Sequence, residues 1–268
     1  MTEWDAAGYA KRSALQEAMA AEALALLSLD GSERVLDVGC GDGRITAAIS
    51  ERLPRGWVMG VDASSAMIAF ARQHGLTGHL NLQFEACDVR KLPFLGEFDL
   101  VVSFNALHWI PEQAEALRGI HGALKPDGHA QLRLVPTGNR KNLETVLEET
   151  RRSDRWARYF DGFRDPYLRL TQHQYAELAE DCGFRVMSFR TELKSWDFQT
   201  REAFFKFGEV TFVEWTRCLP DVEKPAFITD VLDGYRGVAA ADSSDSALTG
   251  DNVFHFYQMD IALERIAS

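Results

Sequence analysis

Three glycines and one acid near the start of the chain have the types and spacing of a ligand site. Gly39, Gly41 and Gly43 stand at alternate positions, and Asp37 precedes the first of them by two residues. Because glycine has no Cβ, the backbone can turn sharply there and come close to a bound molecule. The apolar residues before the turn predict a buried strand over 35–38, and residues 44–53 have the pattern of a helix. This strand, turn and helix predict a nucleoside-type cofactor at the carboxyl end of the strand.

Further polar residues follow the next expected strands. Residues 57–62 predict a strand that ends in Asp62, where an acid can accept hydrogen bonds from both hydroxyls of a ribose. Residues 80–86 predict a third strand, followed by Asp88, which could instead cap the turn after it. A nearly all-apolar fourth strand, 98–105, leads into Asn105-Ala-Leu-His-Trp109.

The rest of the chain completes an α/β pattern. Helices are expected over 6–29, 66–74, 112–124, 143–163 and 171–182; a turn over 125–128; strands over 129–135, 184–191 and 253–266. The fold class is therefore a doubly wound, mostly parallel seven-stranded sheet.

The glycine spacing separates two cofactor classes. The dinucleotide fingerprint is G-x-G-x-x-G, and its third glycine would fall at Arg44. The pattern G-x-G-x-G with Asp37 ahead of it resembles the first motif of the class I S-adenosylmethionine-dependent methyltransferases, with a Rossmann-like fold. The resemblance implies that the glycine turn lies under the methionyl part of the cofactor and that Asp37 binds its amino group. This is chemically sound, because an ammonium group favours a neighbouring carboxylate.

The same resemblance implies the other residues that bind S-adenosyl-L-methionine. Asp88 would meet the adenine amino group, and Val89 would pack on the ring. The expected cofactor-binding set is Tyr9, Asp37, Gly39, Cys40, Gly41, Gly43, Asp62, Ala63, Asp88, Val89 and Asn105. Cys40 is expected as a small packed residue rather than a nucleophile.

A narrower resemblance concerns the methyl acceptor. The segments Trp4-x-x-x-x-Tyr9 with Gln16, Phe104 to Trp109, and Trp156 to Tyr159 leading to Tyr167 resemble small-molecule carboxyl O-methyltransferases. These include juvenile hormone acid, trans-aconitate and malonyl-thioester methyltransferases. The resemblance implies that Gln16 and Trp109 hold the substrate carboxylate. His108 is either a further donor or a packed imidazole bonded to the backbone.

The predicted reaction is methyl transfer to the carboxylate of a small organic acid, giving a methyl ester. A carboxylate is already ionised at neutral pH and needs no base, and no Ser/His/Asp set or cluster of metal ligands stands out. The alternative is O-, N- or C-methylation of another small nucleophile, with His108 as a base. A nicotinamide-linked oxidoreductase is disfavoured by Arg44, and a non-catalytic cofactor-binding protein is a third class.

Composition restricts the partners. Among 268 residues, 46% are hydrophobic and the formal net charge is −11, which fits a globular protein and argues against nucleic acid. No long apolar run predicts a membrane span, and the acidic first residues do not resemble a secretory signal, so we expect a cytoplasmic monomer or homodimer. Four cysteines without a C-x-x-C pair support neither zinc nor a disulfide framework.

The predicted organisation has a core interrupted by helical segments. We expect an N-terminal helical lid over 1–30, a cofactor-binding core over 31–136, a helical cap insert over 137–170, a core helix and strand over 171–195, a second cap insert over 196–240, and a linker and last core strand over 241–268. The N-terminal segment could instead pack on the sheet as an ordinary amphipathic helix. Aromatics in the inserts suggest an apolar cavity, whereas the arginines there could bind a polyanionic acid. The alternative is that the aromatics pack as core and that most of the arginines form a solvated helix face. These arginines are Arg151, Arg152, Arg155, Arg158, Arg164 and Arg169.

Overall fold

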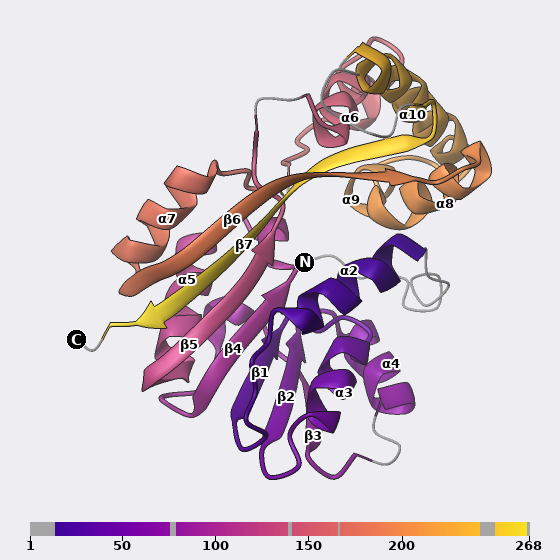
Figure 1. Ribbon diagram of the computed structural model, residues 1–268. Coiled ribbons are helices and arrows are strands. Elements are labelled where there is room, and N and C mark those ends of the chain that lie inside the picture. The colour runs from indigo at the N-terminus through magenta and orange to yellow at the C-terminus, as the bar shows by residue number, and fades with distance from the viewer. Residues whose placement is uncertain (1–13, 76–78, 139–140, 166, 242–249, 267–268) are drawn as a thin grey trace. The chain divides into compact units, whose positions relative to one another are not determined.

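The computed structural model describes residues 14–75, 79–138, 141–165, 167–241 and 250–266 and contains a seven-stranded sheet in the order β3-β2-β1-β4-β5-β7-β6 (Figure 1). The strands are β1 (Arg34–Val38), β2 (Trp57–Asp62), β3 (Leu82–Ala86), β4 (Phe98–Phe104), β5 (Leu124–Leu134), β6 (Phe184–Asp197) and β7 (Val253–Arg265). The pairs β1/β2, β2/β3, β1/β4 and β4/β5 are parallel, and β5/β7 is antiparallel. The expected α/β sheet is confirmed, and it is mixed.

Helices join and flank these strands. They are α2 (Ala14–Ala25), α3 (Arg44–Glu51), α4 (Ser65–Gly75), α5 (Gln113–Ala123), α6 (Leu143–Arg151), α7 (Gln172–Asp181), α8 (Arg201–Thr211), α9 (Val213–Thr216) and α10 (Lys224–Ala241). Local sequence explains several of their starts. Thr171 and Gln174 form a complete capping box at the start of α7, and the Asn142 side chain accepts from the Thr145 N–H at the start of α6.

Two hydrophobic clusters lie on opposite faces of the sheet, because successive strand side chains point to opposite sides. In β1, Leu36 belongs to one cluster with Leu117 of α5, whereas Val35 belongs to the other with Ile49 of α3. Both faces of the central strands are therefore covered, as their continuous apolar runs indicate.

Two local expectations are wrong. The expected turn over 125–128 lies inside β5, where the β4/β5 register shifts between Phe98 and Leu100. Phe98 pairs with Leu124 and Leu100 pairs with His129, so β5 has more residues than β4 between these two pairs. β5 accommodates residues 125–128 as a local irregularity. The expected helix over 143–163 ends at Arg151, because the Ser153 backbone N–H (3.1 Å) and hydroxyl (2.7 Å) both donate to the Thr150 carbonyl.

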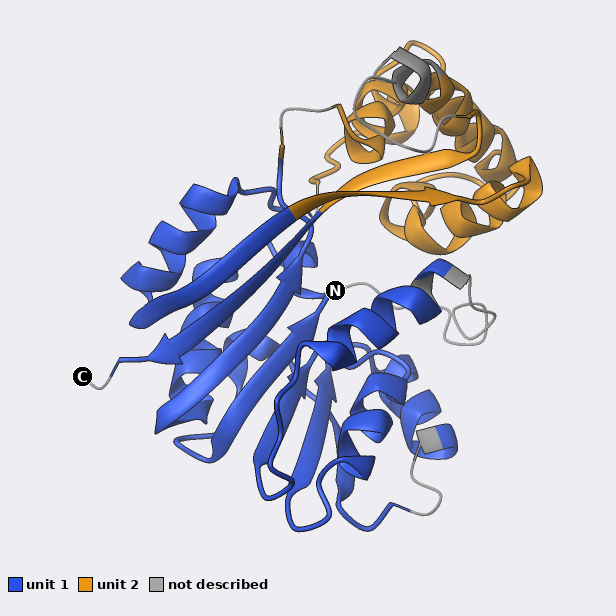
Figure 2. Cartoon of the chain, in the orientation of Figure 1, with its two compact units in different colours: residues 1–137, 167–191, 258–268 blue, residues 138–166, 192–257 orange. Residues whose placement is uncertain are grey.

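The chain divides into two compact units (Figure 2). The first contains residues 1–137, 167–191 and 258–268, and the second contains 138–166 and 192–257. The segments expected as cap inserts fall largely in the second unit. That they cover a site stays a prediction.

A buried arginine connects three elements of the first unit. The Arg133 side chain is 2% exposed and forms a two-pronged pair with Asp260 on β7, with N–O distances of 2.6 and 2.9 Å. Its remaining terminal nitrogen donates to the Met19 carbonyl of α2 at 3.2 Å. One guanidinium thus holds α2 against the β5/β7 ladder.

Breaking this pair should destabilise the protein strongly. We expect Arg133→Met to cost about 3–5 kcal/mol of unfolding free energy, because it leaves the Asp260 carboxylate without its buried partner. Denaturant unfolding of the full chain measures this. Lys141→Met, which removes the half-exposed Lys141–Glu149 pair, serves as the matched control and should change the midpoint little. Equal effects of the two variants would contradict the assigned role of Arg133.

Candidate functional site

The glycine turn joins β1 to α3 through left-handed backbone. Gly39, Gly41 and Gly43 have φ values of 74°, 54° and 80°. Residues that carry a Cβ rarely adopt this left-handed region of backbone conformation. A Cβ on Gly39 would lie 2.2 Å from the Cβ of Ala106, whereas one on Gly41 would meet nothing within 4 Å. The first glycine therefore allows close packing. The second faces open space that a ligand can approach.

Asp37 lies on β1 just before this turn and is buried. The Thr46 hydroxyl donates to its carboxylate at 2.7 Å. Burial raises the pKa of Asp37 to about 7, with a smaller contribution from the negative charge of Asp62. A cation bound beside Asp37 would restore its ionised form, so this carboxyl is suited to an ammonium group.

Asp62 ends β2 and connects that strand to the turn. Its carboxylate accepts from the Gly41 N–H at 3.0 Å and from the Ser64 N–H at 2.8 Å. Ala63, between them in sequence, is half-buried. Backbone donors thus orient the carboxylate at the carboxyl end of β2, the edge where ligands bind in such sheets.

Asp88 follows β3 and caps the short 3-10 turn Val89–Lys91. It accepts from the Arg90 backbone N–H at 3.0 Å, and Arg90 also pairs with it through its guanidinium. These hydrogen bonds with Arg90 lower the pKa of Asp88, so it is ionised at neutral pH. The capping role is therefore observed. The role towards adenine stays a prediction, as does that of Val89, which is buried.

Cys40 is buried within the turn, and burial raises the pKa of its thiol well above the usual value. A thiol held in the protonated form is a poor nucleophile, so its geometry fits a small packed residue. The four cysteines are free. Within the described ranges, no group of three or more His, Cys, Asp or Glu side chains is arranged to hold a metal.

The turn after β4 brings Asn105, His108 and Trp109 to the same edge of the sheet. Asn105 has a left-handed φ of 58°, and its N–H donates to the Arg133 carbonyl at 2.9 Å. The next turn of 3-10 helix, Leu107–Trp109, carries the imidazole and the indole. The Tyr167 ring packs against both, with centroid distances of 5.4 Å to His108 and 4.2 Å to Trp109.

His108 is held neutral. Its side chain is buried, and burial together with the nearby Arg169 charge lowers its pKa to about 3. Its Nδ1 atom makes no hydrogen bond within the described part of the chain. A packed imidazole is therefore observed, although not bonded to the backbone through Nδ1. A base with this pKa is weak near neutrality.

Two expected site residues have side chains outside the part of the chain that the structure describes. Tyr9 lies outside the described residues, as does Trp4. Gln16 belongs to α2, but its side chain is also outside them. Their roles stay predictions.

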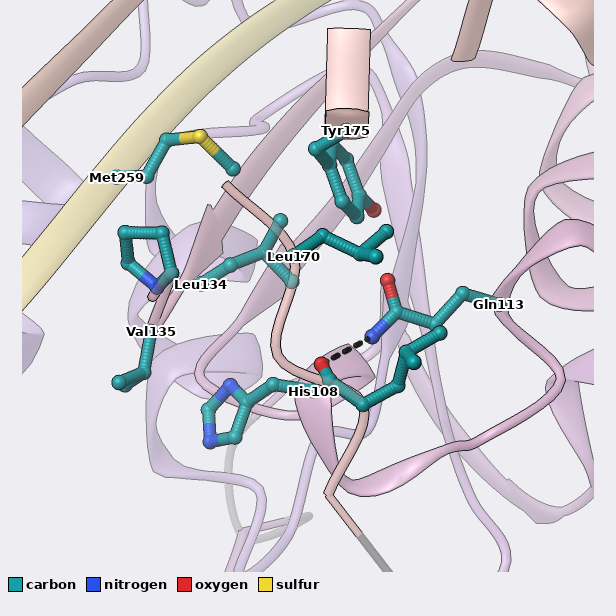
Figure 3. Close-up of a pocket in the computed structure, with 9 residues that line it drawn as sticks. His108, Gln113, Leu134, Val135, Leu170, Tyr175 and Met259 are labelled. Atoms are coloured by element: carbon teal, nitrogen blue, oxygen red, sulfur yellow. Dashed lines mark hydrogen bonds between the residues drawn. The ribbon is translucent and has the colours of Figure 1, made fainter. Parts of the chain in front are cut away.

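Sequence reasoning missed several residues that support the site. Thr46 binds Asp37, Arg90 binds Asp88, and Gln113 donates through Nε2 to the Leu168 carbonyl at 3.2 Å (Figure 3). The signal for Thr46 is its position: it is a hydroxyl residue in the first turn of α3, directly after the glycine turn. No local pattern signals Gln113.

The large aromatics of the second unit largely form its own core, and several of its arginines pair with carboxylates of the same unit. Trp156 Nε1 donates to Asp230 at 2.8 Å, and Trp215 Nε1 donates to Glu148 at 3.0 Å. Arg155 also pairs with Asp230, and Arg151 pairs with Glu148. These groups satisfy one another within the unit.

Comparisons with known proteins agree on one family. A family model described as a methyltransferase domain matches residues 35–128. A trans-aconitate 2-methyltransferase of Deinococcus radiodurans is 32% identical over 191 residues, covering 67% of this chain and 69% of that relative.

Solved structures share the fold. The YcgJ protein of Bacillus subtilis has a TM-score of 0.64 at 18% identity and covers 94% of this chain and 100% of its own. Haemonchus contortus phosphoethanolamine N-methyltransferase 2, solved with S-adenosyl-L-methionine, has a TM-score of 0.57 at 18% identity and covers 92% of this chain and 53% of its own. In the part of the chain that the structure describes, no helix has the length and apolar character to cross a membrane.

Substituting Gly39 should damage the fold itself. Gly39→Ala combines a left-handed φ with an overlap against Ala106, so we expect a loss of about 2–5 kcal/mol of unfolding free energy. Gly122→Ala in α5 is the matched control, since its Cβ meets nothing within 4 Å and should stabilise the helix by about 0.5–1 kcal/mol. Thermal unfolding of both variants measures these changes. If Gly39→Ala unfolds at the same temperature as the unaltered protein, the close packing of Gly39 on Ala106 is contradicted.

The pKa of Asp37 predicts a pH dependence of stability without ligand. Because the folded-state pKa is raised, the native state binds the proton more tightly than the unfolded state between about pH 4 and pH 7. Stability should therefore fall as the pH rises through that window, by about 4 kcal/mol for this group. Asp37→Asn, which keeps an acceptor for Thr46, should flatten this decline in denaturant unfolding. A variant with an unchanged slope would show that another group causes it.

Proposed function

Because this chain belongs to the class I S-adenosylmethionine-dependent methyltransferases, we propose that it methylates the carboxylate of a small organic acid, giving a methyl ester. S-adenosyl-L-methionine is the cofactor, and its sulfonium supplies an electrophilic methyl group when bound. The carrying observation is that His108 is buried and neutral beside Trp109, with its pKa lowered to about 3. An acceptor that needs no base fits this environment.

The residues at the carboxyl ends of β1 to β3 fit this cofactor. Gly41 presents backbone to open space, and Asp37 is a buried carboxyl suited to an ammonium group. Asp62 would accept from the ribose hydroxyls, and Asp88 would accept from the adenine amino group, with Val89 against the ring. Tyr9, Gly39, Cys40, Gly43, Ala63 and Asn105 complete the proposed set.

The acceptor would be oriented by neutral donors. We assign the Trp109 indole N–H and the Gln16 amide to one carboxylate oxygen, with His108 as a further donor. Neutral donors align the oxygen without cancelling the charge that makes it nucleophilic. Support comes from the trans-aconitate 2-methyltransferase relative, whose name refers to methylation of a polycarboxylic acid.

A second candidate is methylation of a different nucleophile with His108 as base. The burial and low pKa of His108 weigh against it, since protonation of a base with a pKa near 3 is unfavourable at neutral pH.

A screen of carboxylic acids, from aconitate to long-chain and terpenoid acids, tests the proposal. We expect S-adenosylhomocysteine release with a methyl ester as product. At saturating cofactor, where the bound ammonium group keeps Asp37 ionised, the rate should show no His-like inflection between pH 6 and 8. Trp109→Phe should raise the KM for the acid by about tenfold, because one hydrogen bond to a charged oxygen is lost. If only phenols, amines or carbon acids are methylated, the carboxyl assignment is wrong. Cofactor binding with no product from any acceptor class would instead indicate a binding protein.

A further inference from the structure

The segment Tyr167–Arg169 is fastened to the turn that carries His108 and Trp109. The Leu168 N–H donates to the His108 carbonyl at 3.3 Å. One residue earlier, the Tyr167 ring packs on both His108 and Trp109. The position of the indole and imidazole therefore depends on where residues 167–168 are held.

Gln113 holds this segment from the first residue of α5. Its side chain is 2% exposed, and its Nε2 donates to the Leu168 carbonyl at 3.2 Å. That bond sets the orientation of the amide, so Oε1 points elsewhere and requires a donor. Yet Oε1 is buried and has no hydrogen-bond partner within the described residues.

The missing donor lies on the same pocket. His108, Gln113, Leu134, Val135, Pro136, Leu168, Leu170, Tyr175 and Met259 line it (Figure 3). The Tyr175 hydroxyl is also buried and unpartnered in the described structure, and it can donate to an acceptor. Figure 3 shows this hydroxyl and the Gln113 amide oxygen on the same side of the pocket, next to Leu170. The pocket is small, with room for about one water.

We propose that one buried water joins the Tyr175 hydroxyl to Gln113 Oε1, and that Gln113, Tyr175 and Tyr167 are positioning residues for the acceptor-binding turn. The water accepts from the tyrosine and donates to the amide, which satisfies two groups that are costly to leave buried and unpaired. The amide is thereby fixed with Nε2 on Leu168, and Tyr167 is fixed against Trp109. The effect on catalysis rests on the proposed function. The water site and the packing of Trp109 do not.

A double-mutant cycle on the full chain tests the connection. We expect Tyr175→Phe and Gln113→Met each to raise the KM for the acid about three- to tenfold, with kcat changed less than about twofold and S-adenosylhomocysteine affinity unchanged. Because both act through one water, the double variant should resemble the worse single variant. Tyr235→Phe is the matched control. It removes another buried hydroxyl, which accepts from the His255 N–H at 2.9 Å in the second unit, and should leave KM unchanged. Additive effects would overturn the connection.

Two further measurements test the inference without measuring methyl transfer. In protein labelled with fluorotryptophan, the fluorine resonance of Trp109, assigned with Trp109→Phe, should shift in Gln113→Met, Tyr175→Phe and Tyr167→Ala, and stay in place in Tyr167→Phe and Tyr235→Phe. A high-resolution crystal structure should show a water between Tyr175 and Gln113. An unmoved resonance in the first three variants would overturn the positioning role, and a direct Tyr175–Gln113 bond or an empty pocket would overturn the water site. If no acid is methylated, the proposed function fails while these readouts still decide this inference.

Discussion

The approach of the Gly39 backbone to Ala106 is the constraint on which the candidate site depends. A Cβ at Gly39 would lie 2.2 Å from the Ala106 Cβ, so only glycine allows β1 and β4 to end this close together. The Gly39 and Cys40 N–H groups both donate to the Val61 carbonyl, at 2.8 and 3.0 Å, which ties the turn to β2. Ala106 directly precedes the Leu107–Trp109 turn. The spacing between the proposed cofactor and acceptor residues is thus set by backbone packing rather than by flexible side chains. In-line transfer between two bound molecules requires that kind of rigidity.

Burial acts on two titratable groups of the site in complementary ways. It raises the pKa of Asp37 to about 7 and lowers that of His108 to about 3. Both groups are pushed towards neutrality, but only Asp37 stands where a cation is expected to bind and restore its charge. A protonated imidazole beside the acceptor would stabilise the ground state of a carboxylate and reduce its nucleophilicity. A neutral one orients it at less cost to reactivity.

The sequence predicts the parts of the molecule that local patterns determine. The glycine turn, the apolar strands and the Thr171 cap follow from residues within a few positions of each other, and the structure contains them. The turn over 125–128 was misplaced because strand irregularity depends on the partner strand, here β4. The helix from Leu143 stops at Arg151 through bonds from Ser153 that compete with helix continuation. Gln113, Tyr167 and Tyr175 come from distant segments, so only the folded chain reveals that they gather around His108.

The second unit contains most of the aromatics and arginines of the two expected inserts. For these residues the sequence allows an apolar cavity, a site for a polyanion, or simply core aromatics and a solvated arginine face. In the structure Trp156 and Trp215 are fully buried, and their indole N–H groups bond Asp230 and Glu148. Arg155 and Arg151 pair with the same two carboxylates. An indole N–H has a single donor, so a buried one that is already paired must give up that partner before it can bind a ligand, which costs free energy. The two tryptophans are therefore poor candidates for either kind of recognition. Arg151 is largely buried, whereas the Arg155 side chain is 56% exposed. The nature of the acceptor should depend instead on the residues around Trp109, where the Tyr167 face and the neutral imidazole are fixed before any substrate arrives.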